Sequence, residues 1–288
     1  MKRFPLLSLA VLVLFSCNIH DNDSDYTNVK VSIIGDGIST FDGWCDMGNI
    51  PSGNSSKMYY PEGDVLTVHD TWWYELIYGI LQHCILEKNL SADNSTIVQN
   101  STGDSSRYWY GWDFGTRLQR QVLGNPDVIL IHGGTCDLGH LEYDNTEEEL
   151  IDGVEMNTGS FPNESQTRLE ELYAEASAAT TVNEADNIDG STFCAAYIRL
   201  LQMIKVRYPA AKVVCVIGDY LDFGQGQAIC RIAELFGDDF VRPVDLLSKY
   251  GHKANSAFPK CSGAYPNADG MGKIAYGVYL EVGTWIEE

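Results

Sequence analysis

The stretch Val31-Ser-Ile-Ile-Gly-Asp-Gly-Ile-Ser-Thr-Phe41 decides the predicted fold. It begins as a short apolar run rich in β-branched residues, ends abruptly in Gly35-Asp36-Gly37, and continues with residues that suit a helix start, Ser39 and Thr40. This pattern predicts a strand that runs through a tight turn into a helix. In open α/β sheets ligands bind at the carboxyl ends of strands, where a helix N-terminus offers unpaired N–H groups. We therefore expect residues 35–40 to line a binding site.

The rest of the chain alternates predicted strands with predicted helices. The further strands are predicted at 95–99, 128–132, 212–217 and 240–244. The helices are predicted at 71–87, 117–123, 191–208, 228–236 and 270–286. The strands are apolar on both faces, which is typical of a parallel sheet covered on both sides. We predict one α/β domain over residues 28–288, a three-layer α/β/α sandwich of the flavodoxin-like type with a central parallel sheet of about five strands.

Residues 138–189 interrupt this alternation. They are acidic, they show little strand pattern, and they are only partly helical, at 167–178. We predict that they form an insertion at the ligand-binding edge of the sheet, or a lid.

The composition excludes one class of partner. The chain has 40 acidic residues against 19 Lys and Arg, which gives a formal net charge of −21. Nucleic-acid binding needs a basic face, so no nucleic-acid partner is expected. Acidity by itself favours solubility and names no function.

The N-terminus has the features of a processing signal. Lys2 and Arg3 precede an apolar run that is too short to span a bilayer. The run ends in Leu14-Phe15-Ser16-Cys17, which resembles a bacterial lipobox; the alternative is an ordinary signal peptide with a chance cysteine. We predict a signal peptide at 1–16, a lipid anchor at Cys17 that attaches the protein to the outer membrane, on its periplasmic or cell-surface face, and an acidic tether at 17–27. The tether also resembles the surface-export signal of lipoproteins in Bacteroides-like bacteria.

The remaining seven cysteines do not indicate a metal site. Their number is odd and no Cys-x-x-Cys spacing occurs, so zinc is not expected. Cys194, Cys215 and Cys230 lie in apolar patterns and are predicted core residues. A bridge between Cys45 and Cys261 stays open. We expect no cofactor and no bound metal.

Four short blocks follow one another along the chain, each at a predicted strand end or loop. They are Gly35-Asp36-Gly37-Ile38-Ser39, Asn100-Ser-Thr-Gly103, Gly133-Gly-Thr-Cys-Asp137 and Tyr265-Pro-Asn-Ala-Asp-Gly-Met271. The first resembles Gly-Asp-Ser-x-Ser, the third Gly-Gly-Thr-Asn-Asp, and the last Asp-x-x-His-Pro-Asn-x-x-Gly-Met. In this order the blocks resemble the SGNH (GDSL) hydrolase family, over nearly all of the chain after the tether. The resemblance implies the family's α/β/α fold and an ancestry among ester hydrolases.

The same resemblance implies that the family's reactive side chains are replaced in this chain. Gly37 stands where the family has its nucleophilic serine, and Cys136 where it has the asparagine that helps to hold the oxyanion. Tyr265 stands at the position of the histidine base, and Ser262 at that of the aspartate that orients it. Of the four residues that give the family its name, only the glycine, Gly103, remains.

These replacements remove the family's chemistry. Glycine has no hydroxyl to attack an acyl carbon, and a tyrosine with an ordinary pKa of about 10 is a poor base near neutrality. The binding half of the site is expected to survive, because backbone N–H groups such as those of Gly37 and Gly103 donate whatever their side chains are. Tyr265 is predicted to be either a stacking surface or a packed loop residue.

The acidic residues of the blocks have two interpretations. The one that we favour is structural: Asp36 and Asp137 hold loops by accepting backbone N–H bonds. The other is a cation held by Asp36, Asp137 and Asp219.

The alternative to a loss of catalysis is a hydrolase whose active site is rebuilt from other residues. Ser39 is a candidate nucleophile, although we expect it to cap the helix that starts there. Cys136 is a candidate thiol nucleophile, with His140, His132 or His252 as its base.

The sequence thus predicts an SGNH-like surface lipoprotein without catalysis. The family's frequent action on acylated carbohydrates implies that it binds a carbohydrate or an acylated small molecule, a glycan or an acylated sugar, at the former active site. The alternatives are an active esterase or lipase with a rewired site, and a structural protein that binds partners through residues 138–189.

Overall fold

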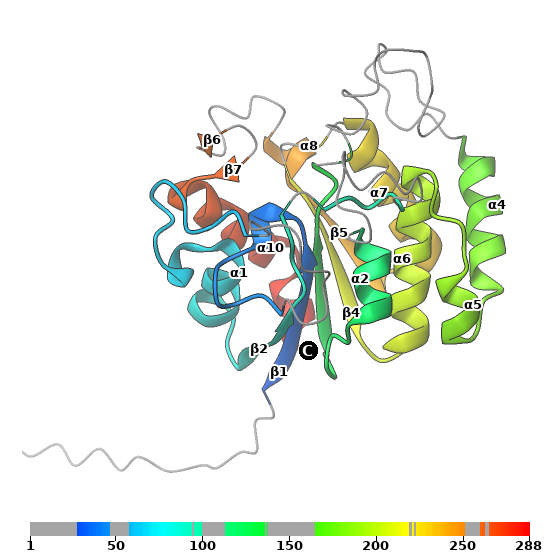
Figure 1. The fold of residues 1–288 in the computed structure, drawn as a ribbon, viewed down its shortest axis with the longest axis horizontal. Coiled ribbons are helices and arrows are strands. Elements are labelled where there is room, and N and C mark those ends of the chain that lie inside the picture. The colour runs from blue at the N-terminus through cyan, green and yellow to red at the C-terminus, as the bar shows by residue number, and fades with distance from the viewer. Residues whose placement is uncertain are drawn as a thin grey trace, which may run out of the picture.

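A parallel sheet of five strands forms the centre of the protein. The computed structural model describes residues 28–46, 58–93, 95–99, 113–135, 137, 165–218, 221, 223–250, 260–262 and 265–288. The strands are β1 (Val29–Gly35), β2 (Cys84–Asn89), β3 (Val128–His132), β4 (Lys212–Ile217) and β5 (Val241–Asp245). Their order is β2-β1-β3-β4-β5 and all neighbours are parallel, which is the flavodoxin-like order (Figure 1). The predicted fold class is confirmed.

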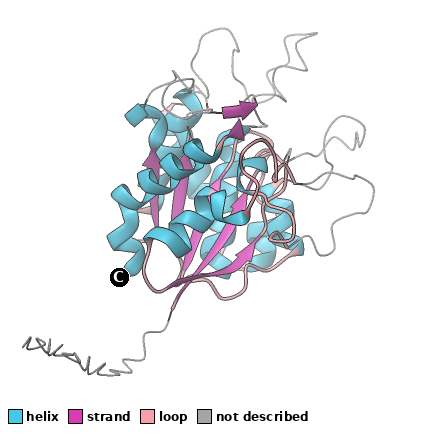
Figure 2. Ribbon diagram, turned by 90° about the vertical axis from the view of Figure 1, so that its left-hand side faces the viewer, coloured by secondary structure: helices cyan, strands magenta, loops and turns pink. Residues whose placement is uncertain are grey.

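Helices cover both faces of this sheet, as Figure 2 shows. One face carries α1 (Trp72–Tyr74), its continuation η3 (Glu75–Ile80) and the last helix α10 (Ala268–Glu287). The other carries α2 (Phe114–Arg120), α6 (Phe193–Arg207) and α7 (Phe223–Phe236). The shorter elements are η1 (Gly37–Ser39), η2 (Val68–Asp70), α8 (Leu246–Tyr250) and the antiparallel hairpin of β6 (Lys260–Ser262) and β7 (Tyr265–Pro266).

The central strands supply side chains to two separate cores. In β3, Val128 and Leu130 enter the core under α1 and α10, whereas Ile129 and Ile131 enter the core under α6. Successive side chains of a strand point to opposite faces, so a strand in a doubly covered sheet must be apolar throughout. This explains why the uninterrupted apolar runs of β3 and β4 predict these strands correctly.

The second strand lies in a different place from the predicted one. The helix predicted to reach Glu87 ends at Ile80, and β2 follows at Cys84–Asn89. His83 adopts a positive φ of 59°, and its carbonyl accepts the Val29 N–H at the start of the β1–β2 pairing. The segment 95–99, predicted to be a strand, joins no sheet. Its Ile97 and Val98 N–H groups donate instead to a side chain, described below.

The described part of the predicted insertion is an outer layer of helices. Residues 165–189 form α4 (Gln166–Ser177) and α5 (Val182–Asp186), and both pack against α6. Leu169, Leu172 and Ala176 of α4 are buried there. This part is therefore neither a lid nor a ligand-binding edge, and residues 138–164 lie outside the described residues.

The described cysteines are thiols. Cys45 is free, so the bridge to Cys261 that the sequence left open is not formed. Cys194 and Cys215 are buried in the core as predicted, whereas Cys230 is only partly buried. Burial raises the pKa of Cys215 to about 12 and that of Cys230 to about 11, so both stay protonated at neutral pH.

The predicted signal peptide, Cys17 and the tether lie outside the described residues, which begin at Asn28. In the part of the chain that the structure describes, no helix combines the length and the apolar character that crossing a bilayer requires.

Candidate functional site

The candidate site lies at the carboxyl edge of the sheet. β1 ends at Gly35, and Asp36 and η1 follow it directly. Two other segments reach the same edge: the loop 90–93 after β2, in which the Ala92 N–H donates to Gly35 O at 3.0 Å, and β7, which contacts η1. Figure 1 places the β6–β7 hairpin at this end of the strands, opposite to the end where the chain enters β1.

Gly37, the position of the family's serine, is enclosed by two side chains. A Cβ atom added to Gly37 would overlap Oδ1 of Asp93 and would lie 2.7 Å from Cε1 of Tyr265. The Tyr265 hydroxyl donates a hydrogen bond of 2.6 Å to the same Asp93 oxygen. Asp93 and Tyr265 therefore fill the space in which a serine side chain would stand.

Tyr265 is held in place from its other side. Its ring stacks on Tyr59, with centroids 3.5 Å apart and planes 7° from parallel. The Tyr59 N–H donates to Thr40 Oγ1 at 2.9 Å, and the Tyr60 hydroxyl donates to Pro266 O at 2.5 Å. Tyr265 is thus both stacked and packed, so the two predicted roles describe one arrangement. We call Gly37, Asp93, Tyr265 and Tyr59 the Gly37 site.

A second carboxyl group lies beneath this site. Asp36 is buried, and its carboxylate accepts the Ile38 N–H at 3.1 Å, which caps η1. Burial raises its pKa from 3.8 to about 6, and the nearby Asp93 carboxylate adds to this rise, whereas the hydrogen bond from Ile38 opposes it. The Asp93 carboxylate is therefore close enough to influence the ionisation of Asp36.

Asp137 holds a loop, as the structural interpretation predicted. Its side chain is buried, and its two oxygens accept the N–H groups of Ile97 and Val98, each at 2.9 Å. These bonds replace the sheet pairing that 95–99 lacks. No group of three or more metal-ligating side chains occurs among the described residues, and Asp219 lies outside them.

Ser39 is enclosed in the core. Its Oγ lies 3.2 Å from Nδ1 of His132 and accepts a hydrogen bond of 3.2 Å from Trp72 Nε1. Ser39 and His132 are both 0% exposed, and burial lowers the pKa of His132 to about 3. A substrate cannot reach this pair. The expectation that Ser39 caps the helix was also wrong, because Asp36 provides that cap.

Several predicted site residues lie outside the described residues. They are Gly103, Cys136, His140 and His252, together with the side chain of Ser262. Of the predicted ligand-binding residues, the structure describes the surroundings of Gly37 and Tyr265, and these two lie next to each other.

Sequence reasoning missed Asp93 and Tyr59. Asp93 follows the half-buried run Cys84–Asn89, and recognising that run as a strand would have placed it at the sheet edge.

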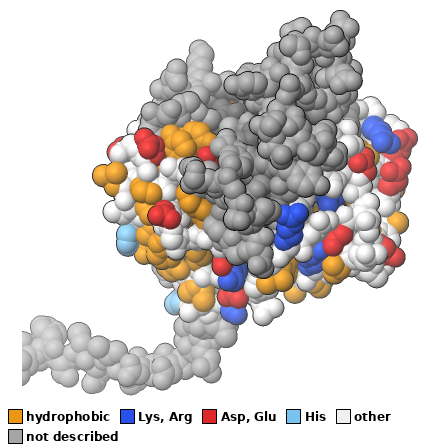
Figure 3. Space-filling model, viewed as in Figure 1, with side chains coloured by type: hydrophobic (Ala, Val, Ile, Leu, Met, Phe, Trp, Pro, Cys, Tyr) orange, Lys and Arg blue, Asp and Glu red, His pale blue; other side chains and the backbone are white. Residues whose placement is uncertain are grey.

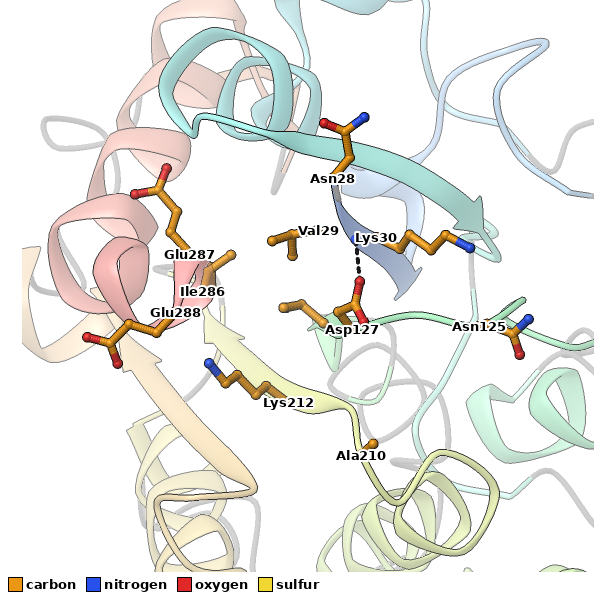
Figure 4. Close-up of a pocket in the computed structure, with 11 residues that line it drawn as sticks. Asn28, Val29, Lys30, Asn125, Asp127, Ala210, Lys212, Ile286, Glu287 and Glu288 are labelled. Atoms are coloured by element: carbon orange, nitrogen blue, oxygen red, sulfur yellow. Dashed lines mark hydrogen bonds between the residues drawn. The ribbon is translucent and has the colours of Figure 1, made fainter. Parts of the chain in front are cut away.

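A separate cavity of about 550 Å³ opens at the opposite, amino edge of the sheet. Figure 4 shows Lys212 of β4 beside Glu288, which follows α10, and Glu287 at the end of α10 farther along the rim. The Lys30 N–H donates to Asp127 at 2.8 Å within it. Because β1 runs from this edge to Gly35, the full length of the strand separates the cavity from the Gly37 site.

The side of the molecule that carries α10 and η3 exposes several large hydrophobic side chains. Hydrophobic atoms are visible there in the space-filling view (Figure 3). The exposed residues of these elements are Tyr78, Tyr276, Tyr279 and Leu280.

Comparisons with known proteins agree with this fold. Residues 29–154 match the family model of the GDSL-like lipase/acylhydrolases. A candidate GDSL-like lipase from Bacteroides uniformis is 24% identical, with a TM-score of 0.57, and the match covers 89% of this chain and 96% of that one. Another from Bacteroides ovatus is 20% identical, with a TM-score of 0.56 and coverage of 88% and 97%. No curated protein matches the sequence.

Proposed function

Because the chain belongs to the GDSL-like lipase/acylhydrolase (SGNH hydrolase) family, we propose that it is a binding member of this family that no longer hydrolyses esters. The observation that carries this proposal is the occupied space beside Gly37. Gly37 lacks the nucleophilic hydroxyl, and Asp93 and Tyr265 fill the space that a side chain at this position would occupy.

Loss of the family's mechanism follows from the chemistry of these groups. Acyl transfer needs a nucleophile, a base that takes its proton and donors that stabilise the oxyanion. Gly37 supplies no nucleophile, and the described Ser–His pair, Ser39 and His132, is sealed in the core. In a serine protease the loss of the nucleophile alone lowers kcat by roughly 10⁶.

The proposed ligand is a glycan or an acylated sugar. Small-molecule sites combine aromatic surfaces with a few polar groups that fix the ligand's orientation. The Tyr59–Tyr265 stack and the Asp93 carboxyl group provide both at the sheet edge where ligands of such folds bind. The family's action on acylated carbohydrates, which motivates the sequence prediction, supports the same class of ligand.

The proposed location is the outer membrane, on its periplasmic or cell-surface face, through lipid at Cys17. The charged start, the apolar run and the lipobox-like sequence before Cys17 support it. Replacing the acceptor by Cys17→Ser should release the protein from the membrane fraction, and continued sedimentation with membranes would contradict the anchor.

Two measurements on purified protein test the proposed function. Hydrolysis of p-nitrophenyl acetate should not exceed that of a boiled control, and acetylated or unmodified xylo-oligosaccharides should bind in calorimetry. Tyr265→Ala should abolish the binding. Tyr276→Ala, an exposed tyrosine of α10, is the matched control and should retain it.

Turnover well above the boiled control would refute the proposal. If thiol alkylation then stopped the reaction, the alternative of a rewired hydrolase with Cys136 as nucleophile would be supported.

A further inference from the structure

The cavity at the amino edge of the sheet carries charged side chains of both signs. It is lined by the first residues of β1, β3 and β4 and by the last turn of α10. Val128 and Ile286 contribute apolar surface to it. Its volume of about 550 Å³ falls within the range of roughly 300–1,000 Å³ that is typical of small-molecule sites. The cavity is therefore large enough to hold a small molecule.

Two of its carboxylates are fixed by backbone hydrogen bonds. Asp127 accepts the Lys30 N–H with its side chain at 2.8 Å, and its own backbone bonds to Lys30 and to Lys212 are both 2.8 Å long. Glu287 accepts the Gln82 N–H with Oε1 at 2.7 Å. Each of these bonds occupies one carboxylate oxygen. The second oxygen of each side chain makes no hydrogen bond within the described part of the chain.

The ammonium group of Lys212 is fixed as well. It donates to Trp285 O, in the last turn of α10, at 2.6 Å, and it lies 5.2 Å from the centre of the Trp285 ring. One of its three N–H groups is used in this way, so two remain for other acceptors. Among the described residues, no ion pair joins Lys212 to any of the three acids that line the cavity. The protein thus holds opposite charges around one cavity without pairing them with each other.

We propose that this cavity binds a short zwitterionic peptide, whose ammonium group meets Asp127 and Glu287 and whose carboxylate meets Lys212. The cavity is separate from the Gly37 site, so the inference goes beyond the proposed function and does not rest on it. Hydrogen bonds between charged groups are stronger than those between neutral ones. A simple cation would face the lysine and a simple anion would face the carboxylates. A zwitterion offers each of these groups the opposite charge.

The apolar surface of the cavity favours a peptide with an aliphatic side chain. Figure 4 shows Val29 and Ile286 in the middle of the cavity, between the charged side chains. Removing aliphatic surface from water against them is favourable. A dipeptide such as Ala-Leu combines this side chain with both terminal charges.

NMR titration of the purified protein with Ala-Leu tests the site. The amide signals of Asp127 and Lys212 should shift until they saturate, and that of Gly37 should not shift. N-acetyl-Ala-Leu lacks the ammonium group and Ala-Leu amide lacks the carboxylate. Each should bind at least about threefold more weakly than Ala-Leu, as expected for the loss of one exposed ion pair. Failure of Ala-Leu to bind, or equal binding of the two capped peptides, would overturn the inference.

Two variants test the role of each charge. Lys212→Met should remove the preference for Ala-Leu over its amide, and Lys273→Met, which removes an exposed lysine of α10, is the matched control and should retain it. Asp127→Asn keeps an oxygen for the backbone bond and should weaken the preference over N-acetyl-Ala-Leu. Glu170→Gln, on the outer helix α4, should not.

The conservative Asp127→Asn change decides the question if Lys212→Met does not fold. Preferences that stay unchanged in the folded variants would overturn the inference. The result is separable from that of the proposed function. If xylo-oligosaccharides do not bind, the proposed glycan function fails and the peptide titration is unaffected, and if Ala-Leu does not bind, only the present inference fails.

Discussion

Gly37→Ser, the change that restores the family's nucleophile, should destabilise the protein. Gly37 lacks a positive φ, so the backbone accepts a side chain and the loss of glycine's freedom in the unfolded chain favours folding by about 0.4–1 kcal/mol. The new Cβ, however, overlaps Asp93 Oδ1 and lies 2.7 Å from Tyr265 Cε1. Such overpacking costs about 1–3 kcal/mol, and separating Asp93 from Tyr265 forfeits a hydrogen bond to a charged group worth about 1.5–3 kcal/mol. We expect a net loss of about 3 kcal/mol.

Urea unfolding measures this loss, with two further variants for comparison. Gly79→Ser is the matched control, because a Cβ there meets only Glu75 Cγ at an ordinary 3.6 Å, and its cost should stay below about 1 kcal/mol. In an Asp93→Gly background the cost of Gly37→Ser should fall by at least about 1.5 kcal/mol, which a double-mutant cycle reports. An unchanged stability in the Gly37→Ser single variant would show that the space beside Gly37 is open, and the reasoning would fail.

Three other predictions concern stability. Asp137→Ala should lower the free energy of unfolding by about 2–4 kcal/mol in urea, because two buried N–H groups lose their acceptor; a loss below 1 kcal/mol would mean that water replaces it. Asp36 has a raised pKa in the folded state, so its contribution to stability falls as pH rises from about 4 to about 6, by about 3 kcal/mol for two pH units at 1.36 kcal/mol each. Asp36→Asn should flatten this part of the plot of unfolding free energy against pH, and an unchanged slope would contradict the shift. His132 has a lowered pKa in the folded state, so its imidazole is protonated in the unfolded chain at a higher pH, and stability should fall as pH drops from about 6.5 to about 3. His132→Phe should remove this dependence. If the midpoint of acid unfolding does not change in this variant, the His132 imidazole is not the cause.

The sequence predicts the middle of the sheet better than its edge. β3 and β4 are buried on both faces, so their apolar runs have a single interpretation. β2 is an edge strand with four half-buried residues, and it follows a tryptophan-rich helix after only a short turn. Its first residues, Cys84 to Leu86, therefore read as a continuation of the helix, because only pairing with β1 makes them extended.

The error at β2 carried over to the candidate site. The resemblance of the four sequence blocks to the family correctly predicts that Gly37 and Tyr265 are neighbours, because both lie in segments whose spacing resembles that of the family. Asp93 belongs to no recognised block, and the strand that delivers it was misplaced by about ten residues. The burial of Ser39 likewise depends on Trp72, which arrives from a different element and which local sequence does not place.

The direction of β1 has a consequence for how the protein would meet its ligand. The chain enters this strand at Val29 and leaves it at Gly35, so the N-terminal start of the domain and the Gly37 site are at opposite poles, about 20 Å of strand apart. If Cys17 carries lipid as we propose, the Gly37 site would lie at the end of β1 that is farther from the attachment point. A binding protein anchored in this way would be expected to take its ligand from the surrounding medium, because molecules embedded in its own bilayer would lie nearer the opposite pole of the domain.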